Sequence, residues 1–321
     1  MRLIGILTAV AGILLLALSG HGAVSQMART IRIVVPFPAG GSADDLARLL
    51  ADQIGRTQGV NFVVENRPGA GTVVATEAVS RTAPDGNTLL IVANSFVINP
   101  SLKKLNYDPF VSFAPVCHLV SSPLIIAVNS DSPYRSLADL ISAARAKPGE
   151  LTLASVAPAT TQHIAFEMLK RVADMNMIHV PYPGGAPAVT ALLGGHVTAV
   201  IANYSEVEAH LASGKLRALA TASRKRIEAA PDLPTVAESG YPNYATEVWF
   251  GLVAPAKTPA ETVSQLSGWF GSALETAAVK EKLRLQEMYP AGTCGAAFAA
   301  HLRDQFDAYA RVIREADIKA E

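Results

Sequence analysis

The stretch Ile31-Arg-Ile-Val-Val-Pro-Phe-Pro-Ala-Gly-Gly-Ser-Ala-Asp-Asp-Leu-Ala-Arg48 predicts a strand, a glycine loop and a helix in direct succession. Residues 31–35 are β-branched apart from Arg32, which favours a buried strand. Apolar residues then recur at helical spacing, at Leu46, Leu49, Leu50 and Ile54. Ser42 stands at the expected N-cap of the helix, with Asp45 three residues on as its capping-box partner.

The loop of this unit, Pro38-Ala39-Gly40-Gly41, carries no bulky side chain. Backbone N–H groups at a helix start are unpaired, and the helix dipole adds partial positive charge. The loop therefore predicts a binding site for a small anion. A tight turn alone would also explain two glycines. Asp44 and Asp45 compete for the same positive field, so we expect both to cap the helix and to face away from the ligand.

The first 25 residues have the pattern of a signal peptide. Arg2 supplies a basic start, the following apolar run is shorter than the roughly 20 residues of a membrane span, and Ala23-Val24-Ser25 fits a cleavage site before Gln26. Cysteine is absent near that site, which argues against a lipoprotein. These features predict an exported, soluble protein.

Charge and composition exclude some classes of function. Removal of the signal peptide takes away one Arg from 27 basic residues and leaves the 27 acidic residues, so the balance is close to neutral and gives no support for nucleic-acid binding. Half of the residues are hydrophobic and 17% are charged, which supplies large buried sheets. The remaining length is enough for two domains of ordinary size.

Cys117 and Cys294 are the only cysteines. They could pair in an oxidising compartment, but two buried free thiols are the more common outcome, and the sequence leaves both open. Cys117-His118 stands alone without the spacing of a metal site, so we expect no metal and no cofactor.

The unit of strand, small-residue loop and helix recurs along the chain and predicts an α/β fold with parallel strands. The loops form two groups, at 36–42, 66–72 and 94–96, and at 155–163, 182–187 and 202–205. Ligands of such sheets bind beyond the carboxyl ends of the strands, where these loops lie. Two extended segments, 121–129 and 248–253, could carry the chain to a second lobe and back. We therefore expect two lobes facing a ligand cleft, each a mainly parallel sheet flanked by helices, with residues 26–125 and 254–321 in the first lobe and 126–253 in the second.

An ordered series of motifs resembles a known family. The series comprises Val35-Pro-Phe-Pro-Ala-Gly-Gly41 with Asp44 and Arg48, Val64-Glu-Asn-Arg-Pro-Gly-Ala-Gly71, Ala83-Pro-Asp-Gly86, His179-Val-Pro-Tyr182, Gly184-Gly-Ala-Pro187, Leu193-Gly-Gly195, Gly214-Lys-Leu-Arg-Ala-Leu219, Leu233-Pro-Thr-Val-Ala-Glu238 and Trp249-Phe-Gly-Leu252. Together they resemble the Bug-type solute-binding receptors of tripartite tricarboxylate transporters.

The resemblance implies a two-lobed, type II-like periplasmic binding protein that closes over a small mono- or dicarboxylate and presents it to a membrane permease. It also implies a monomer. A periplasmic ligand-sensing subunit of the same fold, signalling to a sensor partner, is the alternative. An enzyme is disfavoured, because the chain has neither a G-x-S-x-G elbow nor a Rossmann fingerprint.

The resemblance also implies the binding residues, which lie on loops of both lobes. They are Pro38, Ala39, Gly40, Gly41 and Ser42 on the first lobe, and Ser155, Val156, Ala157, Thr160, Thr161, His163, Gly184, Gly185 and Asn203 on the second.

Several of these residues have a purely structural alternative. The hydroxyls of the 155–161 stretch could serve local turn and cap bonds, and His163 could pack or cap. Among other candidates, His179 is expected in the core, Arg67 could pair with Glu65, and Phe96 and Trp249 are better explained by core packing than by a place in the cavity wall.

Three departures from the family pattern concern the ligand. The family's Gly-Asn-Gly-Ser-Pro-Ser is replaced by Ala157-Pro-Ala-Thr-Thr-Gln162, a common basic residue by Pro183, and a frequent acidic residue by Ala202. The last change removes a typical partner of an ammonium group. A plain carboxylate is therefore favoured over an amino acid.

Overall fold

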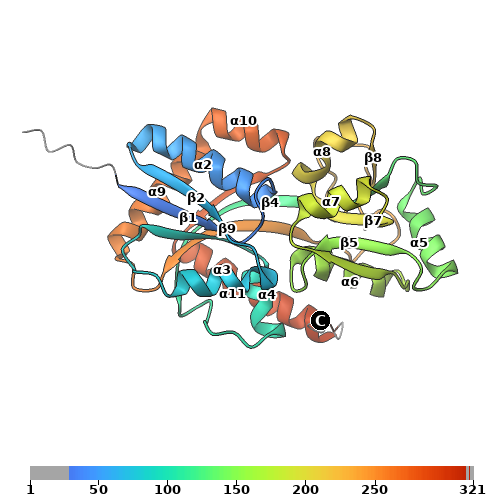
Figure 1. Ribbon diagram of the computed structural model, residues 1–321, viewed down its shortest axis with the longest axis horizontal. Helices are drawn as coiled ribbons and strands as arrows, with labels where there is room; N and C mark the ends of the chain where they lie inside the picture. Colours follow the sequence, from blue (N-terminus) through green and yellow to red (C-terminus); the bar gives the residue numbers. More distant parts are fainter. Residues whose placement is uncertain (1–28, 316–317, 319–321) are drawn as a thin grey trace, which may run out of the picture.

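One long strand, β4 (Phe113–Asn129), runs through both halves of the computed structural model, which describes residues 29–315 and Ile318 (Figure 1). As far as Pro123 it pairs with β9 (Glu247–Pro255), and from Leu124 it pairs with β7 (Ala199–Asn203). The two halves of β4 thus belong to two sheets, which form the two lobes. The predicted signal peptide lies outside the described residues.

The first lobe is built on the sheet order β2-β1-β3-β9-β4, with β10 on the other side of β4. Its further strands are β1 (Thr30–Val35), β2 (Asn61–Asn66), β3 (Thr88–Ala93) and β10 (Tyr289–Cys294). Its helices are α2 (Ser42–Gln58), the 3-10 turn η1 (Ala70–Thr72), α3 (Val73–Ser80), α4 (Ser95–Leu102), α9 (Ala260–Glu275), α10 (Ala277–Leu285) and α11 (Ala296–Glu315). Separate buried clusters cover the two faces of this sheet, one with α2, α9 and α10 and one with α3, α4 and α11.

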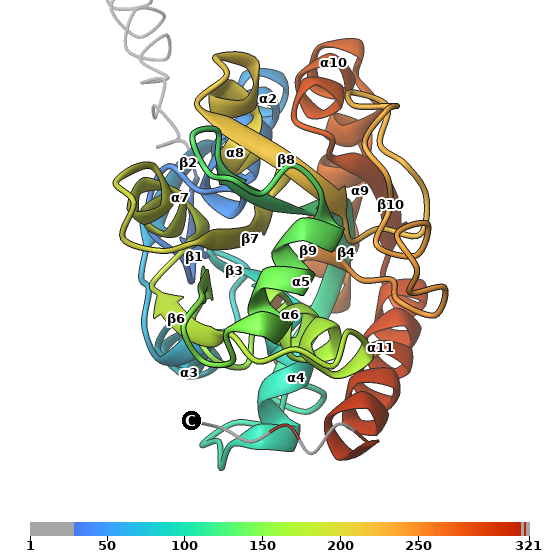
Figure 2. The same cartoon turned by 90° about the vertical axis from the view of Figure 1, so that its right-hand side faces the viewer.

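The second lobe is built on the order β6-β5-β7-β4-β8. Its further strands are β5 (Thr152–Val156), β6 (Ile178–Tyr182) and β8 (Leu216–Thr221), and its helices are α5 (Leu137–Ala146), α6 (Thr161–Val172), α7 (Gly185–Leu193) and α8 (Tyr204–Ala212). Figure 2 views this lobe end on, with α11 of the first lobe running along its side. The two-lobed α/β prediction is confirmed.

Both sheets contain more antiparallel strand pairs than predicted. The pairs β1–β2, β1–β3, β5–β6 and β5–β7 are parallel, whereas every pair that β4 or β9 makes is antiparallel. The reason is that these two strands carry the chain between the lobes in opposite directions. The strand β9 lies in the first sheet, although the division expected from the sequence put residues 248–253 in the second lobe.

Cys117 of β4 and Cys294 of β10 lie opposite each other in the antiparallel register and form a disulfide. The preference for two free thiols is therefore wrong. The pattern Tyr289-Pro-Ala-Gly-Thr-Cys294 has little strand propensity, so its pairing with β4 could not be predicted from residue type.

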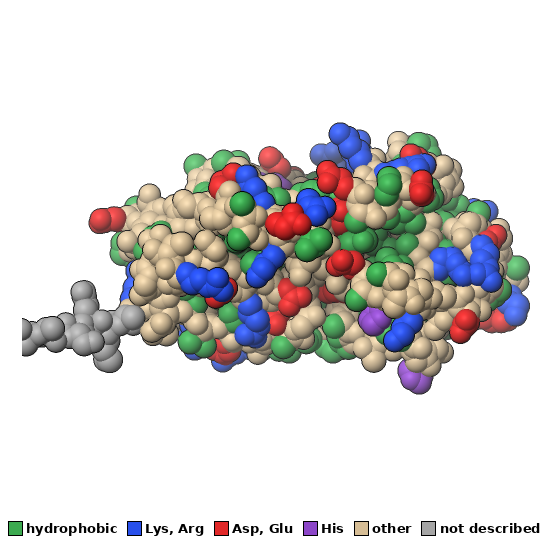
Figure 3. Space-filling model, turned by 90° about the horizontal axis from the view of Figure 1, so that it is seen from above, with side chains coloured by type: hydrophobic (Ala, Val, Ile, Leu, Met, Phe, Trp, Pro, Cys, Tyr) green, Lys and Arg blue, Asp and Glu red, His purple; other side chains and the backbone are tan. Residues whose placement is uncertain are grey.

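Within residues 29–315, every helix is too short or too polar to cross a bilayer. Figure 3 shows acidic and basic side chains interspersed over one face of the molecule, in keeping with the near-neutral charge. The surface in this view therefore offers no extended field of one sign.

Candidate functional site

A cleft lies between the lobes at the carboxyl ends of β1, β3, β5 and β7, and its empty space, including the part that is open to solvent, is about 480 Å³. The first lobe lines it with Phe37, Pro38, Gly41, Ser42, Ala43, Ala93, Ser95, Val248 and Phe250. The second lobe lines it with Val156, Thr160, Thr161, Gln162, Gly184, Gly185, Ala186, Pro187, Asn203 and Glu206. Five helices in the described part of the chain, α2, α4, α6, α7 and α8, begin at this cleft and direct their positive dipole ends toward it.

The loop before α2 is held by Asp44. The Asp44 carboxylate accepts hydrogen bonds from the Gly40 N–H at 3.0 Å, from Arg48 at 3.0 Å and from the Asn66 amide at 3.0 Å. Burial alone would raise the pKa of Asp44, but these bonds and the Arg48 charge together hold it below its usual value. Gly40 has a φ of +78°, which suits glycine, so residue type and carboxylate together fix the loop.

The predicted capping box at Ser42 and Asp45 is wrong. Gly41 is the N-cap of α2, without a side-chain cap, and Ser42 is the first helical residue. Neither Asp44 nor Asp45 lines the cleft, as expected. Because Ser42 does not cap its own helix, its side chain is available to the other lobe.

Ser42 contacts the second lobe directly. Its hydroxyl accepts a hydrogen bond from the Asn203 side-chain amide at 2.9 Å and lies 2.8 Å from the Ser205 hydroxyl. The Asn203 carbonyl oxygen in turn accepts from the Gln162 amide at 3.5 Å. Polar groups from α2, α6 and α8 are thereby connected at one end of the cleft.

The two lobes also approach each other closely at two glycines. A Cβ at Gly184 would lie 2.9 Å from Cδ of Pro38, and a Cβ at Gly71 would lie 2.6 Å from the Pro158 carbonyl oxygen. Glycine is therefore required at both positions for the lobes to approach this closely.

The loop after β5 uses its hydroxyls partly for its own geometry. Thr160 is the N-cap of α6, accepting from the His163 N–H, and its hydroxyl donates to the Ala157 carbonyl at 2.8 Å. Val156, Thr160 and Thr161 line the cleft, whereas Ala157 does not.

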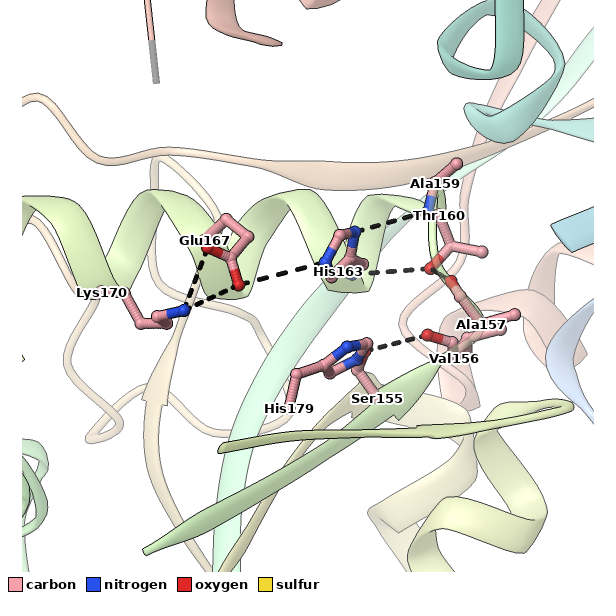
Figure 4. A network of polar contacts seen from close by, with 9 residues as sticks. All are labelled: Ser155, Val156, Ala157, Ala159, Thr160, His163, Glu167, Lys170 and His179. Carbon is pink, nitrogen blue, oxygen red and sulfur yellow. Dashed lines mark hydrogen bonds and ion pairs between the residues drawn. The ribbon is translucent and has the colours of Figure 1, made fainter. Parts of the chain in front are cut away.

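Ser155 and His163 lie behind this loop, away from the cleft lining (Figure 4). The Ser155 hydroxyl is 2.7 Å from Nε2 of His179, and the rings of His163 and His179 stack with centroids 4.6 Å apart. Burial, with a smaller effect of His179, lowers the pKa of His163 to about 3, so its ring is neutral at physiological pH. The two residues therefore support the loop as structural groups.

The cleft brings together nine of the fourteen predicted residues: Pro38, Gly41, Ser42, Val156, Thr160, Thr161, Gly184, Gly185 and Asn203. It leaves out Ala39 and Gly40, which are exposed, together with Ser155, Ala157 and His163. Arg67 pairs with Glu65 at 3.0 Å, and Phe96 and Trp249 are buried in the first lobe, as the structural alternatives stated.

Sequence reasoning missed Glu206 and much of the apolar wall. Asn203 and Glu206 have the spacing of a helix start, and the Glu206 carboxylate accepts from the Asn203 N–H at 2.9 Å. That spacing predicts the cap but gives no sign that the carboxylate faces the cleft. Val248 and Phe250 line the cleft because they lie on the face of β9 opposite to that of Trp249, which packs in another cluster of the first lobe.

Within the described residues, His, Cys, Asp and Glu form no group of three that could hold a metal ion.

Two α/β lobes joined by β4 and β9, with a cleft lined by helix starts, define the class of two-lobed solute-binding proteins. Residues 46–318 match the sequence model of the family described as "Tripartite tricarboxylate transporter family receptor", and the chain belongs to this family.

Relatives with known names agree with this assignment. The chain is 36% identical to Protein BugT of Bordetella pertussis over 324 residues, covering 99% of this chain and 98% of BugT. The structure of periplasmic binding protein BugD is similar with a TM-score of 0.88 and 31% identity, covering 91% of this chain and 99% of BugD.

Two further similar structures contain ligands. An R. palustris protein solved with adipate has a TM-score of 0.88 and 33% identity, covering 92% of this chain and 99% of its own. MatC from Rhodopseudomonas palustris with bound malate has a TM-score of 0.83 and 28% identity, covering 89% and 99%. Because the family and these neighbours are solute-binding proteins, this chain is a solute-binding protein and not an enzyme.

Proposed function

We propose that the protein captures a small organic mono- or dicarboxylate in the periplasm and delivers it to the membrane permease of a tripartite tricarboxylate transporter. The observation that carries this proposal is the start of five helices at one cleft whose described lining contains neither Lys nor Arg. Helix N-termini supply N–H donors and partial positive charge, which suit a carboxylate without a cationic side chain.

The rest of the lining supports an organic ligand. Phe37, Pro38, Val156, Val248 and Phe250 provide apolar walls between the polar helix starts. A short hydrocarbon chain fits such walls while its carboxylate contacts the helix starts. Adipate and malate, bound by two similar structures, have this character.

The same geometry supports closure of the lobes over the ligand. We propose that the hinge lies where β4 changes sheets, after Pro123, and where the chain returns through Glu247 into β9. Residues from both lobes then contact one carboxylate, and the cross-cleft contacts of Ser42 form in the closed state.

The expected affinity is in the range of a reversible receptor. Hydrogen bonds to a charged group contribute roughly 1.5–3 kcal/mol each, so three or four give about 5–12 kcal/mol. Micromolar binding needs about 8 kcal/mol. Main-chain N–H groups and hydroxyls therefore suffice without an arginine clamp.

Native mass spectrometry of the purified protein, followed by calorimetry with malate and adipate, tests this function. We expect a co-purified acid or a saturable heat with at least one dicarboxylate. The absence of binding heat with a full panel of mono- and dicarboxylates would contradict the proposed function. Co-purification with a permease, as opposed to a sensor protein, would test the transport role, and mass measurement would test the expected monomer.

A further inference from the structure

Glu206 reaches across the cleft from the first turn of α8. Its carboxylate accepts from the Asn203 N–H at 2.9 Å on its own helix. It also receives hydrogen bonds from the N–H and the hydroxyl of Ser42, at the start of α2 in the other lobe. A side-chain carboxylate of the protein therefore lies at the helix start that is expected to bind an anion.

Two glycines leave space for this carboxylate. A Cβ at Gly185, the first residue of α7, would overlap the Glu206 carboxylate, and a Cβ at Gly41 would lie 3.5 Å from its Oε1. Glu206 thus lies between the starts of α2 and α7. A carboxylate ligand that uses these helix starts arrives beside it.

Among the described residues around Glu206, no unpaired positive side chain faces its carboxylate to balance two anions. Among the described lining residues Glu206 is the only charged one, and α7 has no titratable residue. On α2, Asp45 adds negative charge near Glu206, while Asp44 and Arg48 pair with each other at 2.9 Å. Glu208 of α8 and Lys282 of α10 line a separate surface groove.

Two carboxylates that share one site without a cation repel each other, and this repulsion raises the pKa of one of them. Burial already raises the pKa of Glu206 to about 7, against the lowering effect of its hydrogen bonds. A proton on Glu206 removes the repulsion and turns the side chain into a hydrogen-bond donor.

We propose that the protein binds its carboxylate together with one proton, which is taken from solvent and held on Glu206. The Glu206 O–H then donates to an oxygen of the bound carboxylate. This inference rests on the proposed function and makes Glu206 a specificity-determining residue for anionic ligands. The competing hypothesis is that Glu206 stays ionised and pairs with the ammonium group of a ligand.

Calorimetry in buffers of different ionisation enthalpy measures the proton count. At about pH 8 we expect malate or adipate to bind with uptake of close to one proton, and the affinity to fall up to about tenfold per pH unit above the pKa. Glu206→Gln mimics the protonated side chain and keeps a residue that capping boxes accept. This variant should take up no proton and bind at least several-fold more tightly than wild type at about pH 8.5.

Glu208→Gln on the same helix is the matched control and should keep the wild-type pH profile. Binding without proton uptake, or loss of binding in Glu206→Gln with preference for a zwitterion, would overturn the proposal.

A readout without ligand separates this proposal from the proposed function. Since the raised pKa belongs to the closed cleft, lowering the pH from about 8 to about 6 should favour closure of the free wild type, seen as a smaller radius of gyration in solution scattering. Glu206→Gln should show no such pH response, whereas Glu208→Gln should show it. If no acid binds but the pH-dependent closure of wild type is observed, only the carboxylate function is contradicted. If Glu206→Gln closes with pH as wild type does, the role of Glu206 is overturned.

Discussion

The Asn203 side-chain amide donates to the Ser42 hydroxyl over 2.9 Å, and this bond joins the first turn of α2 to the N-cap of α8. Both residues are buried, and they come from different lobes. Their bond therefore links the two lobes, and the opening of the cleft that we propose would break it.

Ser42→Ala should weaken carboxylate binding by about five- to tenfold, because a net hydrogen bond of roughly 1 kcal/mol is lost and the Asn203 amide is left without this partner in the closed state. Thermal unfolding should change little, since each lobe keeps its own core. Calorimetry with malate or adipate measures the effect, and Ser80→Ala on α3 is a control away from the cleft. Unchanged affinity would remove Ser42 from the site.

Gly184→Ala should block closure. Its φ of −170° is extended backbone open to any residue, so the second lobe folds normally, yet the new Cβ would lie 2.9 and 3.1 Å from Cδ and Cγ of Pro38. Overpacking of about 1–3 kcal/mol corresponds to a loss of affinity of roughly 5- to 150-fold.

Solution scattering with saturating ligand should leave Gly184→Ala more extended than wild type. Gly268→Ala in α9, where a Cβ would meet nothing within 4 Å, is the matched control. If both variants compact on ligand addition as wild type does, Pro38 and Gly184 do not limit closure.

Removal of the disulfide in Cys117→Ala/Cys294→Ala should lower the stability of the first lobe. The bond closes a loop with a sequence separation of 177, so its loss should cost about 2–5 kcal/mol and lower Tm by roughly 5–15 °C. Calorimetric unfolding with and without reductant measures this. Reductant should lower the Tm of wild type and leave the double variant unchanged; a variant as stable as oxidised wild type would contradict the prediction.

Asp44→Asn should destabilise the protein at neutral pH by about 1.5–3 kcal/mol, because the charged hydrogen bonds to Gly40 and Arg48 are weakened. The folded-state pKa of Asp44 is lowered, so its stabilisation is present above the unfolded pKa of about 4 and is lost as the pH falls through the folded pKa. Urea unfolding at about pH 7 and about pH 3 should show a difference that shrinks at the lower pH. A difference independent of pH would assign the effect to packing instead.

Local patterns predicted the units of this fold well. Strand β1 and the buried face of α2, with Leu46, Leu50 and Ile54, follow directly from residue type and spacing. The expected loops at 36–42, 155–163, 182–187 and 202–205 each contribute to the cleft, because carboxyl ends of parallel strands meet at one edge.

Long-range pairing could not be predicted in the same way. Nothing in the local pattern of residues 289–294 indicates that they pair with β4, and the disulfide depends on that register. Glu206 was missed for a related reason: its spacing from Asn203 explains a helix cap, and only the approach of α2 from the other lobe reveals that the same carboxylate faces the ligand site.

Helix starts of both lobes are expected to bind one carboxylate, and an amide NMR titration of ¹⁵N-labelled protein with malate or adipate detects this binding at single residues. We predict that the amides of Ser42 on α2 and Ala186 on α7 shift together and give the same dissociation constant. Shifts confined to one lobe, or two unrelated dissociation constants, would show that the two helix starts do not bind one carboxylate together.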